Sequence, residues 1–393
     1  MPSAITISRN PVLTGTMDYM RNLRPSAGPS AALAEAGTFS NYSHKIRGLG
    51  GFWQCGFVWH GEMPVLMEMI AEGWMRDIRV MGNRGMEVWE GFNAGMELSL
   101  TGGMPALKVT GYGHFRTLFS RVYNQGGAPG VLEDISVEIA NILGTGTIGQ
   151  FIVLGAIETN TSEVDRYHNS DRTAGDILFD MCAAGDVLNH RYMIGCYEGK
   201  KLRYEQIARY ETGAAGRLPA YIVDGLQGGI ILKASIDQFA NEVWVRHTPP
   251  GGALTRTPAG HSIDAASKLK FGQKDLPLNG GSASVAIATL ISGTCLSFQG
   301  APGMPDITIG PGTVIKDQYG NVVPPEEIRP NNWMLIENLA LPSSAVFSSL
   351  IQNPSALFIE EVAYSEDSGL GITANRDRFT QAQVARLAGR GAG

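Results

Sequence analysis

The chain has 393 residues and a formal net charge of −6, from 37 acidic and 31 basic residues. This length exceeds what one hydrophobic core usually serves, so it predicts several domains that need no disulfide or metal to fold. The absence of lysine or arginine runs argues against tight nucleic-acid binding. The 50 glycines are about twice the usual share, which suits many tight turns. Only 17% of the residues are charged, which suits a surface covered by neighbouring subunits.

The N-terminal residues and the cysteines indicate the compartment. The segment MPSAITISRNPVL lacks a basic start followed by an apolar run, and no window approaches the roughly 20 apolar residues of a membrane span. Cys55, Cys182, Cys196 and Cys295 are far apart and form no CxxC pair. We therefore expect reduced, buried cysteines in a protein made in a cytoplasm, without a membrane span.

Strand signals dominate the chain after an arm at residues 1–37, which shows no clear periodicity. From residue 38 onward, apolar and polar residues alternate as in half-buried antiparallel strands, with tight turns at 82–85 and 101–103. A hairpin turn is expected at 319–321. The predicted strands are 38–47, 51–61, 75–81, 85–92, 94–100, 106–113, 150–157, 191–198, 201–208, 228–234, 241–248, 307–310, 313–323, 331–339 and 355–364.

Helical spacing interrupts the strands in several places. Pro64 suits the first turn of a helix, and Thr173 is a plausible cap of another. A third carries apolar residues on one face before Gly144 stops it. The predicted helices are 64–74, 114–124, 131–143, 173–185, 283–292 and 381–387.

The string GTGTIG, with Gly144, Gly146 and Gly149, matches the dinucleotide-binding pattern GxGxxG. That pattern works only where a strand precedes it and a helix follows, because the helix N-terminus faces the phosphates. Here a predicted helix ends at Leu143 and the strand-like residues 150–157 follow. We therefore expect no nucleotide site.

Asp165, His168, Asp171, Arg172 and the later His190 are the residue types of an acid/base or metal site. No two potential ligands among them have helical i, i+4 spacing, and no HExxH string occurs. We interpret this region as a hydrated loop. The GxSxG elbow, the Walker A loop and the kinase HRD string are also absent.

A pair of carboxylates could still serve a glycosidase, because such pairs lack a sequence signature. Glu68, Glu72, Glu87 and Glu90 are the candidates. We interpret each of them as a solvent-facing residue of a helix or strand.

Four tryptophans, Trp53, Trp59, Trp74 and Trp89, fall within 37 residues. They could form a sugar-stacking surface. The favoured interpretation is the core and subunit interface of a β-domain, where aromatic rings contribute most of the buried area.

Four segments in order carry a family resemblance. They are RDIRVMGNRGMEVWEGFNAGMELSLTGG with VTGYGHFRTLFSRVYN, then residues 158–205, then 241–292, and last IRPNNWMLIENL with residues 358–389. Together they resemble tail-tip hub proteins of long-tailed phages, a group related to the baseplate hub of contractile tails.

The resemblance implies a mainly β fold with α insertions, built from tandem small β-barrel or sandwich domains like those of tail tubes. It implies a structural protein rather than an enzyme, so we expect no catalytic, cofactor-binding or metal-binding residue. The expected domains are an arm at 1–37, a first tube-like barrel at 38–125, a mixed α/β insert at 126–215, a second tube-like domain at 216–300 and a C-terminal β domain at 301–393.

The resemblance also implies partners. We expect a homo-oligomer, with a trimer favoured over a hexamer, that contacts tail tube, distal tail and tape-measure proteins and tail fibres or receptor-binding proteins. DNA would pass through its lumen without specific binding, in the virion tail tip of a particle assembled in the host cytoplasm. Two alternatives stay open: a carbohydrate-binding or wall-degrading tail protein, and a distal-tail adaptor ring or head-closure protein.

Overall fold

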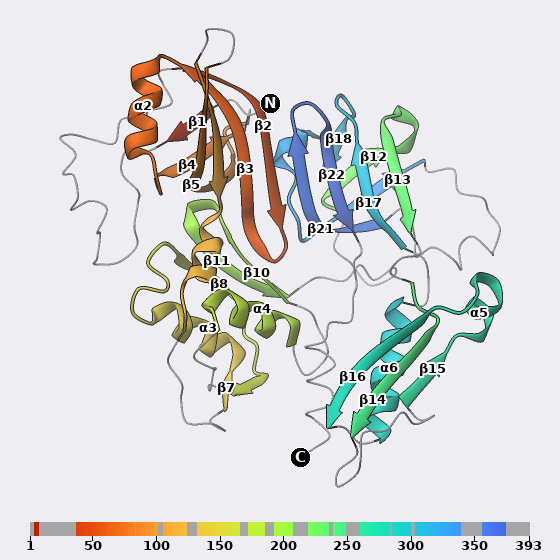
Figure 1. Ribbon diagram of the computed structural model, residues 1–393. Coiled ribbons are helices and arrows are strands. Elements are labelled where there is room, and N and C mark those ends of the chain that lie inside the picture. The colour runs from red at the N-terminus through yellow and green to blue at the C-terminus, as the bar shows by residue number, and fades with distance from the viewer. Residues whose placement is uncertain are drawn as a thin grey trace.

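The computed structural model shows a mainly β protein with helical insertions (Figure 1). This confirms the predicted fold class in its coarse form. Strand pairings among the described residues do not close into a barrel. The structure describes residues 4–7, 37–82, 84–100, 105–123, 132–165, 172–184, 192–206, 219–235, 239–248, 260–282, 285–299, 303–338 and 356–374.

Ten strands of the described chain pair in one antiparallel series that draws on both ends of the sequence. Along β2, Tyr42, His44 and Ile46 are buried while Ser43 and Lys45 lie on the opposite face, as the period of two requires. In spatial order the strands are β1 (Ala4–Ile7), β4 (Asp77–Met81), β5 (Glu87–Ser99), β6 (Ala106–Tyr112), β3 (Gly50–Gly61), β2 (Gly37–Arg47), β21 (Ala356–Ser365), β22 (Gly369–Ala374), β17 (Gly303–Ile309) and β13 (Ile230–Ser235).

A second branch leaves this series at β21. It runs through β20 (Asn332–Glu337), β12 (Tyr221–Asp224), β18 (Ile315–Asp317) and β19 (Val322–Val323), and only the pairing of β12 with β20 is parallel. The short 3₁₀ helix η7 (Pro325–Glu327) precedes β20. Strands from before and after residues 239–299 thus combine in one sheet.

An α/β insert follows β6. Its strand β10 joins the main sheet by a short parallel pairing with β3 at Gly50 and Gly51. Gly51 has φ +72°, and a Cβ there would lie 2.1 Å from the carbonyl oxygen of Cys196, so only glycine permits this close approach. The insert comprises η3 (His114–Ser120), β7 (Leu132–Asp134), α3 (Ile135–Gly144), β8 (Val153–Ile157), β9 (Glu163–Asp165), α4 (Ala174–Ala184), β10 (Tyr192–Tyr197), η4 (Glu198–Lys200) and β11 (Lys201–Gln206).

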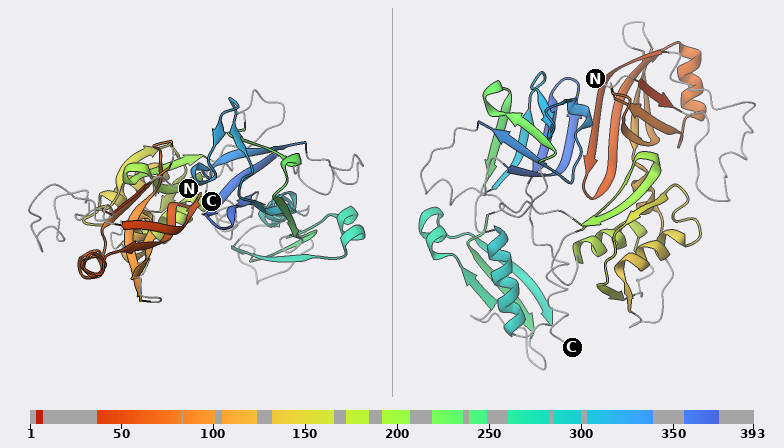
Figure 2. Two further views of the ribbon diagram at one scale, coloured as in Figure 1. Left: turned by 90° about the horizontal axis from the view of Figure 1, so that it is seen from above. Right: turned by 180° about the vertical axis from the view of Figure 1, so that it is seen from behind.

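A smaller α/β unit lies apart from the large sheet, as the front view (Figure 1) and the rear view (Figure 2) agree. The side chain of Asp264 accepts a hydrogen bond of 2.9 Å from the backbone N–H of Ser267 and so caps its short helix. Val243, Val245 and Ile291 form part of its own core. The unit comprises β14 (Glu242–Thr248), β15 (His261–Ile263), α5 (Ala265–Phe271), β16 (Asp275–Ser282) and α6 (Val285–Gln299).

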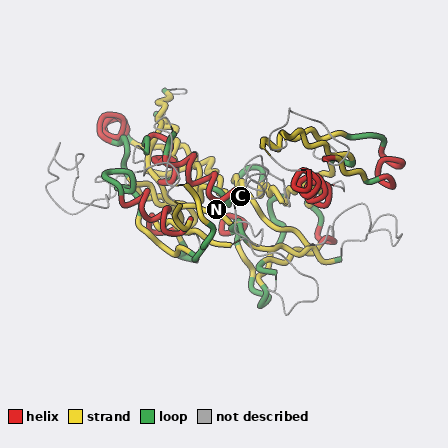
Figure 3. The backbone as a smooth tube through the Cα atoms, turned by 90° about the horizontal axis from the view of Figure 1, so that it is seen from below, coloured by secondary structure: helices red, strands yellow, loops and turns green. Residues whose placement is uncertain are grey.

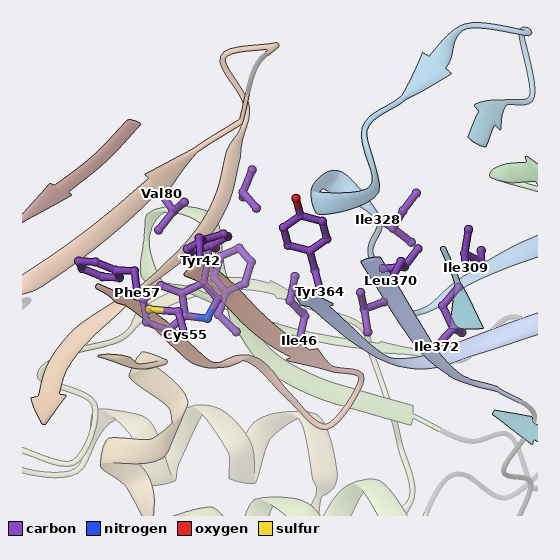
Figure 4. Close-up of a cluster of buried hydrophobic side chains, with 14 of the residues drawn as sticks. Tyr42, Ile46, Cys55, Phe57, Val80, Ile309, Ile328, Tyr364, Leu370 and Ile372 are labelled. Atoms are coloured by element: carbon purple, nitrogen blue, oxygen red, sulfur yellow. The ribbon is translucent and has the colours of Figure 1, made fainter. Parts of the chain in front are cut away.

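The main hydrophobic core is continuous across the β2–β21 pairing. Figure 4 shows it running from Phe57 and Val80 past Tyr42 and Tyr364 to Leu370. A second cluster, built from η3, α3, α4 and β10, fills the α/β insert. The β regions at the two ends of the sequence therefore share one core, whereas the insert and the smaller unit each have their own.

Several predicted elements differ from those observed. Residues 85–92 and 94–100 are one strand, β5, because a shift of register at Asn93 bends the chain without breaking it. The helix expected at 114–124 is the shorter η3, whereas the one at 64–74 is confirmed as α2 (Met63–Glu72). Strands predominate, and the helices form separate groups (Figure 3). The helix expected at 381–387 lies outside the described residues, as does the arm at 1–37 except for β1 and Gly37.

Candidate functional site

A β-bulge brings two of the four candidate glutamates together. In a regular strand, residues three apart lie on opposite faces. Beyond Val80, however, the register of β4 against β5 shifts by one residue, and Val88 and Trp89 are both buried in succession. The extra residue turns Glu87 and Glu90 to the same side of the strand.

The two carboxyl groups interact. Burial, the nearby charge of Glu90 and a hydrogen bond shared with Glu90 raise the pKa of Glu87 from 4.5 to about 8. Glu90 is 1% exposed, its Oε1 lies 3.3 Å from Nε of Arg79, and its Oε2 accepts a hydrogen bond of 2.9 Å from the backbone N–H of Lys200. At neutral pH Glu87 is therefore mainly protonated, next to the contact of Glu90 with Arg79.

A buried ion pair lies beside these glutamates. Nζ of Lys200, on η4 of the insert, donates to both carboxylate oxygens of Asp77 on β4, at 2.8 and 3.0 Å. Nε2 of His114 lies 3.8 Å from Oδ1 of Asp77. Burial and the charges of Lys200 and Arg79 hold the pKa of His114 well below its usual range, so this imidazole is neutral. The pair fixes the insert to the first part of the sheet.

Arg329 brings the C-terminal part of the sequence to the same place. Its Nη2 donates to the backbone carbonyl of Glu87 at 2.5 Å, and its Nε donates to Oε1 of Glu198 at 3.4 Å. Nearby, Nε of Arg84 donates to the buried Glu327 at 2.6 Å. We name this cluster the charged junction; it comprises Asp77, Arg79, Glu87, Glu90, Glu198, Lys200 and Arg329.

The expectation that all four glutamates face solvent is wrong for Glu90, which the bulge turns into the interior. Glu68 and Glu72 are half-buried on α2, and Glu72 pairs with Arg76 at 3.5 Å. A glycosidase uses one protonated and one ionised carboxyl group. Glu90 does not suit either role, because it is 1% exposed and enclosed by protein. Sequence reasoning missed the junction itself; its one signal was the consecutive Val88 and Trp89, which break the alternation.

The tryptophans divide between core and surface. Trp59 and Trp89 are buried, as the core interpretation predicts, while Trp53 is half-buried and Trp74 is 49% exposed. Trp53 lines a surface hollow of about 530 Å³, which we name the aromatic hollow. The described residues of its lining are Trp53, Met75, Phe92, Tyr112, Arg116, Thr117, Phe119 and Ser120.

A second hollow, of about 590 Å³, spans the two β regions. It lies on the face of the sheet opposite the core, which we name the polar face. Its charges are largely paired, because Lys45 and Arg47 both contact Glu361, and Nζ of Lys108 lies 4.0 Å from Glu97. Uncharged residues dominate the lining of this hollow, among them Ser43, Gln54, Gly56, Thr110, Thr308, Ala363, Ser365, Ser368 and Gly371.

The remaining candidates give no site. His168, Asp171 and His190 lie outside the described residues, and Arg172 pairs with Asp180 on α4. Within the described ranges, no group of three or more His, Cys, Asp or Glu residues could hold a metal ion. The glycine string lies between α3 and β8, the order expected from the sequence, which cannot present a helix N-terminus to phosphates.

Two further predictions are tested by the described residues. All four cysteines are unpaired and buried, as expected, and burial raises the pKa of the Cys55 thiol. In the part of the chain described, no helix is both long and apolar enough to span a membrane.

Comparison with known proteins reveals a likeness of fold. No protein-family model and no curated protein sequence matches the chain. A tail protein from Neisseria meningitidis MC58 is similar over 97% of this chain and 99% of its own, with a TM-score of 0.56 and 11% identity. The 43 kDa tail protein of prophage MuSo2 from Shewanella oneidensis is similar over 94% of this chain and 96% of its own, with a TM-score of 0.54 and 9% identity.

At such low identities the likeness establishes the fold, which is that of these tail proteins over nearly the whole chain. The resemblance to phage tail proteins drawn from the sequence is thereby confirmed at the level of the fold.

Proposed function

We propose that this chain is a structural protein of a phage tail tip, a homo-oligomeric hub that continues the tail tube and surrounds a lumen for DNA. The observation that carries the proposal is the similarity to two tail proteins over nearly their whole length as well as its own. A wall-degrading enzyme is less well supported, because the carboxylate pair it would use includes the enclosed Glu90.

The polar face is the proposed wall of the lumen. It is built mainly from small and hydroxyl-bearing residues, and its lysines lie next to glutamates that offset their charge. A wall without unpaired lysine or arginine clusters would not hold the phosphates of passing DNA. The continuous core behind it would keep both β regions rigid.

The division into domains is part of this proposal. The limits expected from the sequence, an arm to residue 37, a first tube-like domain to 125, an insert to 215, a second tube-like domain to 300 and a C-terminal domain, stay a prediction. Because β12 and β13 pair with β18, β20 and β17, we propose that the second tube-like unit combines residues 219–235 with 303–374. The smaller α/β unit would then be an insertion in it.

The proposed partners are other copies of this chain, a trimer being favoured, with the tail tube, distal tail and tape-measure proteins on the axis and tail fibres or receptor-binding proteins at the periphery. Sedimentation analysis of the purified full chain tests the first of these. A trimer, with a ring and open centre by electron microscopy, is the expected result. A strict monomer at high concentration contradicts the hub assignment.

Cysteine labelling tests the lumen. The native cysteines are all buried, so new surface cysteines can be followed against a low background. In Thr308→Cys, on the polar face, a maleimide attached to a bulky polymer should react with dissociated protein and be excluded from the assembly. Tyr319→Cys, at a residue 80% exposed in the chain, is the matched control and should react in both states. Equal reactivity of Thr308→Cys in both states would contradict the assignment of the polar face to the lumen wall.

A further inference from the structure

The aromatic hollow contains an arginine that is held in place but has no acidic partner among the described residues. The guanidinium carbon of Arg116 lies 3.5 Å from the ring centre of Tyr112 and 5.1 Å from that of Trp53. In the part of the chain that the structure describes, no carboxylate forms an ion pair with Arg116. Stacking engages the face of the guanidinium and leaves its N–H edge able to donate. Arg116 is therefore oriented for an anion that the described part of the chain does not supply.

The two small hydroxyl groups of the hollow are already engaged. The hydroxyl of Thr117 donates to the carbonyl of His114 at 2.7 Å, and that of Ser120 donates to the carbonyl of Thr117 at 2.8 Å. These hydroxyls retain only the capacity to accept. Among the lining residues that the structure describes, Arg116 is the one charged side chain and none is a carboxylate.

The rest of the lining is apolar and largely aromatic. Trp53, Met75, Tyr112 and Phe119 are all half-buried, so each has apolar surface left to cover. Phe119 contacts Trp53 edge-on at 6.1 Å between ring centres, which gives the hollow a rigid wall. Its volume of about 530 Å³ lies within the range of pockets that bind ligands.

We propose that the aromatic hollow binds a segment of a partner protein in which an aspartate or glutamate stands beside a large apolar side chain. The carboxylate would accept hydrogen bonds from the planar guanidinium group of Arg116, and the apolar side chain would pack against the aromatic rings. Tryptophan, tyrosine and arginine are the residues that most often dominate such protein interfaces. A neutral sugar fits less well, because its many hydroxyls need several donors and acceptors, and the lining offers few polar groups besides Arg116.

Selection of peptides on the intact protein tests this proposal. An mRNA-display library of random dodecapeptides is selected against the full chain. The affinities of the selected peptides are then measured by fluorescence polarisation. We expect the selected peptides to be rich in acidic residues next to aromatic or large aliphatic residues. Arg116→Gln should weaken them by about tenfold or more, the worth of a charge-assisted hydrogen bond. Arg116→Lys keeps the charge but lacks the planar guanidinium, so its affinities should lie between those of the natural protein and those of Arg116→Gln.

Lys108→Gln is the matched control, since it removes an exposed cation on the polar face and should leave the affinities unchanged. An unchanged melting temperature shows that the Arg116 variants are folded; if Gln unfolds the protein, the comparison rests on the Lys variant. The proposal is overturned if the selected peptides lack acidic residues, if their affinities do not depend on Arg116, or if no peptide binds. It is equally overturned if uronic-acid oligosaccharides bind in an Arg116-dependent way and the peptides do not. A trimer would still support the proposed function in each of these cases, so the two proposals fail separately.

Discussion

Replacing Glu87 with glutamine should make the protein more stable in alkali and leave it unchanged in acid. The folded state raises the pKa of Glu87 from 4.5 to about 8, first through burial and then through the charge of Glu90. The folded protein therefore retains a proton that the unfolded chain releases. The free energy of unfolding must fall as the pH rises between these two values, and the loss is complete above the folded pKa.

The magnitude follows from the shift. At about 1.4 kcal/mol per pKa unit, the full shift would correspond to roughly 5 kcal/mol for an enclosed group. Glu87 is only half-buried, so solvent screening reduces the effect, and we expect about 2 kcal/mol. Glutamine resembles the protonated acid and has no proton to lose. Glu87→Gln should thus exceed the stability of the natural protein by less than about 1 kcal/mol at pH 5 and by about 2 kcal/mol at pH 9.

Denaturation in urea, followed by tryptophan fluorescence at both pH values, measures the difference. Glu97→Gln is the matched control, because it makes the same change on the same strand at a side chain 77% exposed. Its effect should stay within about 0.5 kcal/mol at either pH. A Glu87→Gln effect that is equal at pH 5 and pH 9 would refute the buried, proton-sharing pair.

Two further substitutions test the junction and the glycine contact. Lys200→Met removes the buried ion pair with Asp77 and should cost about 3–5 kcal/mol in urea denaturation. Lys201→Met, at the adjacent exposed residue, should cost less than about 0.5 kcal/mol, and similar losses in the two variants would argue against the ion pair. Gly51→Ala places a methyl group 2.1 Å from the carbonyl oxygen of Cys196, so it should abolish the docking of β10 and produce early protease cleavage within the insert. Gly85→Ala has a similar φ of +75° but open space around it, and should cost only about 1 kcal/mol; equal damage from both changes would assign the effect to backbone strain alone.

The sequence predicted most of the long elements because their patterns are local. The alternation along residues 38–47 and 106–113 and the proline at the start of α2 each determine an element without help from distant residues. The short strands β12 and β15 were not predicted, because a few residues carry too little pattern and are held by partners far away in the sequence. The same holds for β16, in which Pro277 and Gly280 interrupt any strand pattern and the pairing with β14 defines the strand.

The charged junction was beyond sequence reasoning for a related reason. Asp77 and Lys200 are 123 residues apart, and nothing near either of them indicates that the other is its partner. The prediction of a solvent-facing Glu90 assumed a regular strand, and the bulge invalidated that assumption. The tryptophan cluster was interpreted correctly as far as Trp59 and Trp89 are buried, but the exposure of Trp74 depends on tertiary packing.

The position of the charged junction bears on how the proposed hub could work. A ring made of many copies closes only if every copy holds the same angle between its parts, and small errors would accumulate around the ring. Apolar contacts alone tolerate sliding, whereas a buried pair such as Lys200 with Asp77 loses several kcal/mol when it is displaced. Arg329 adds a directional contact from the C-terminal part of the sequence to the strand that bears Glu87. We therefore infer that these buried charges hold the insert and both β regions in one fixed geometry, and that this role explains why the cost of burying them is tolerated.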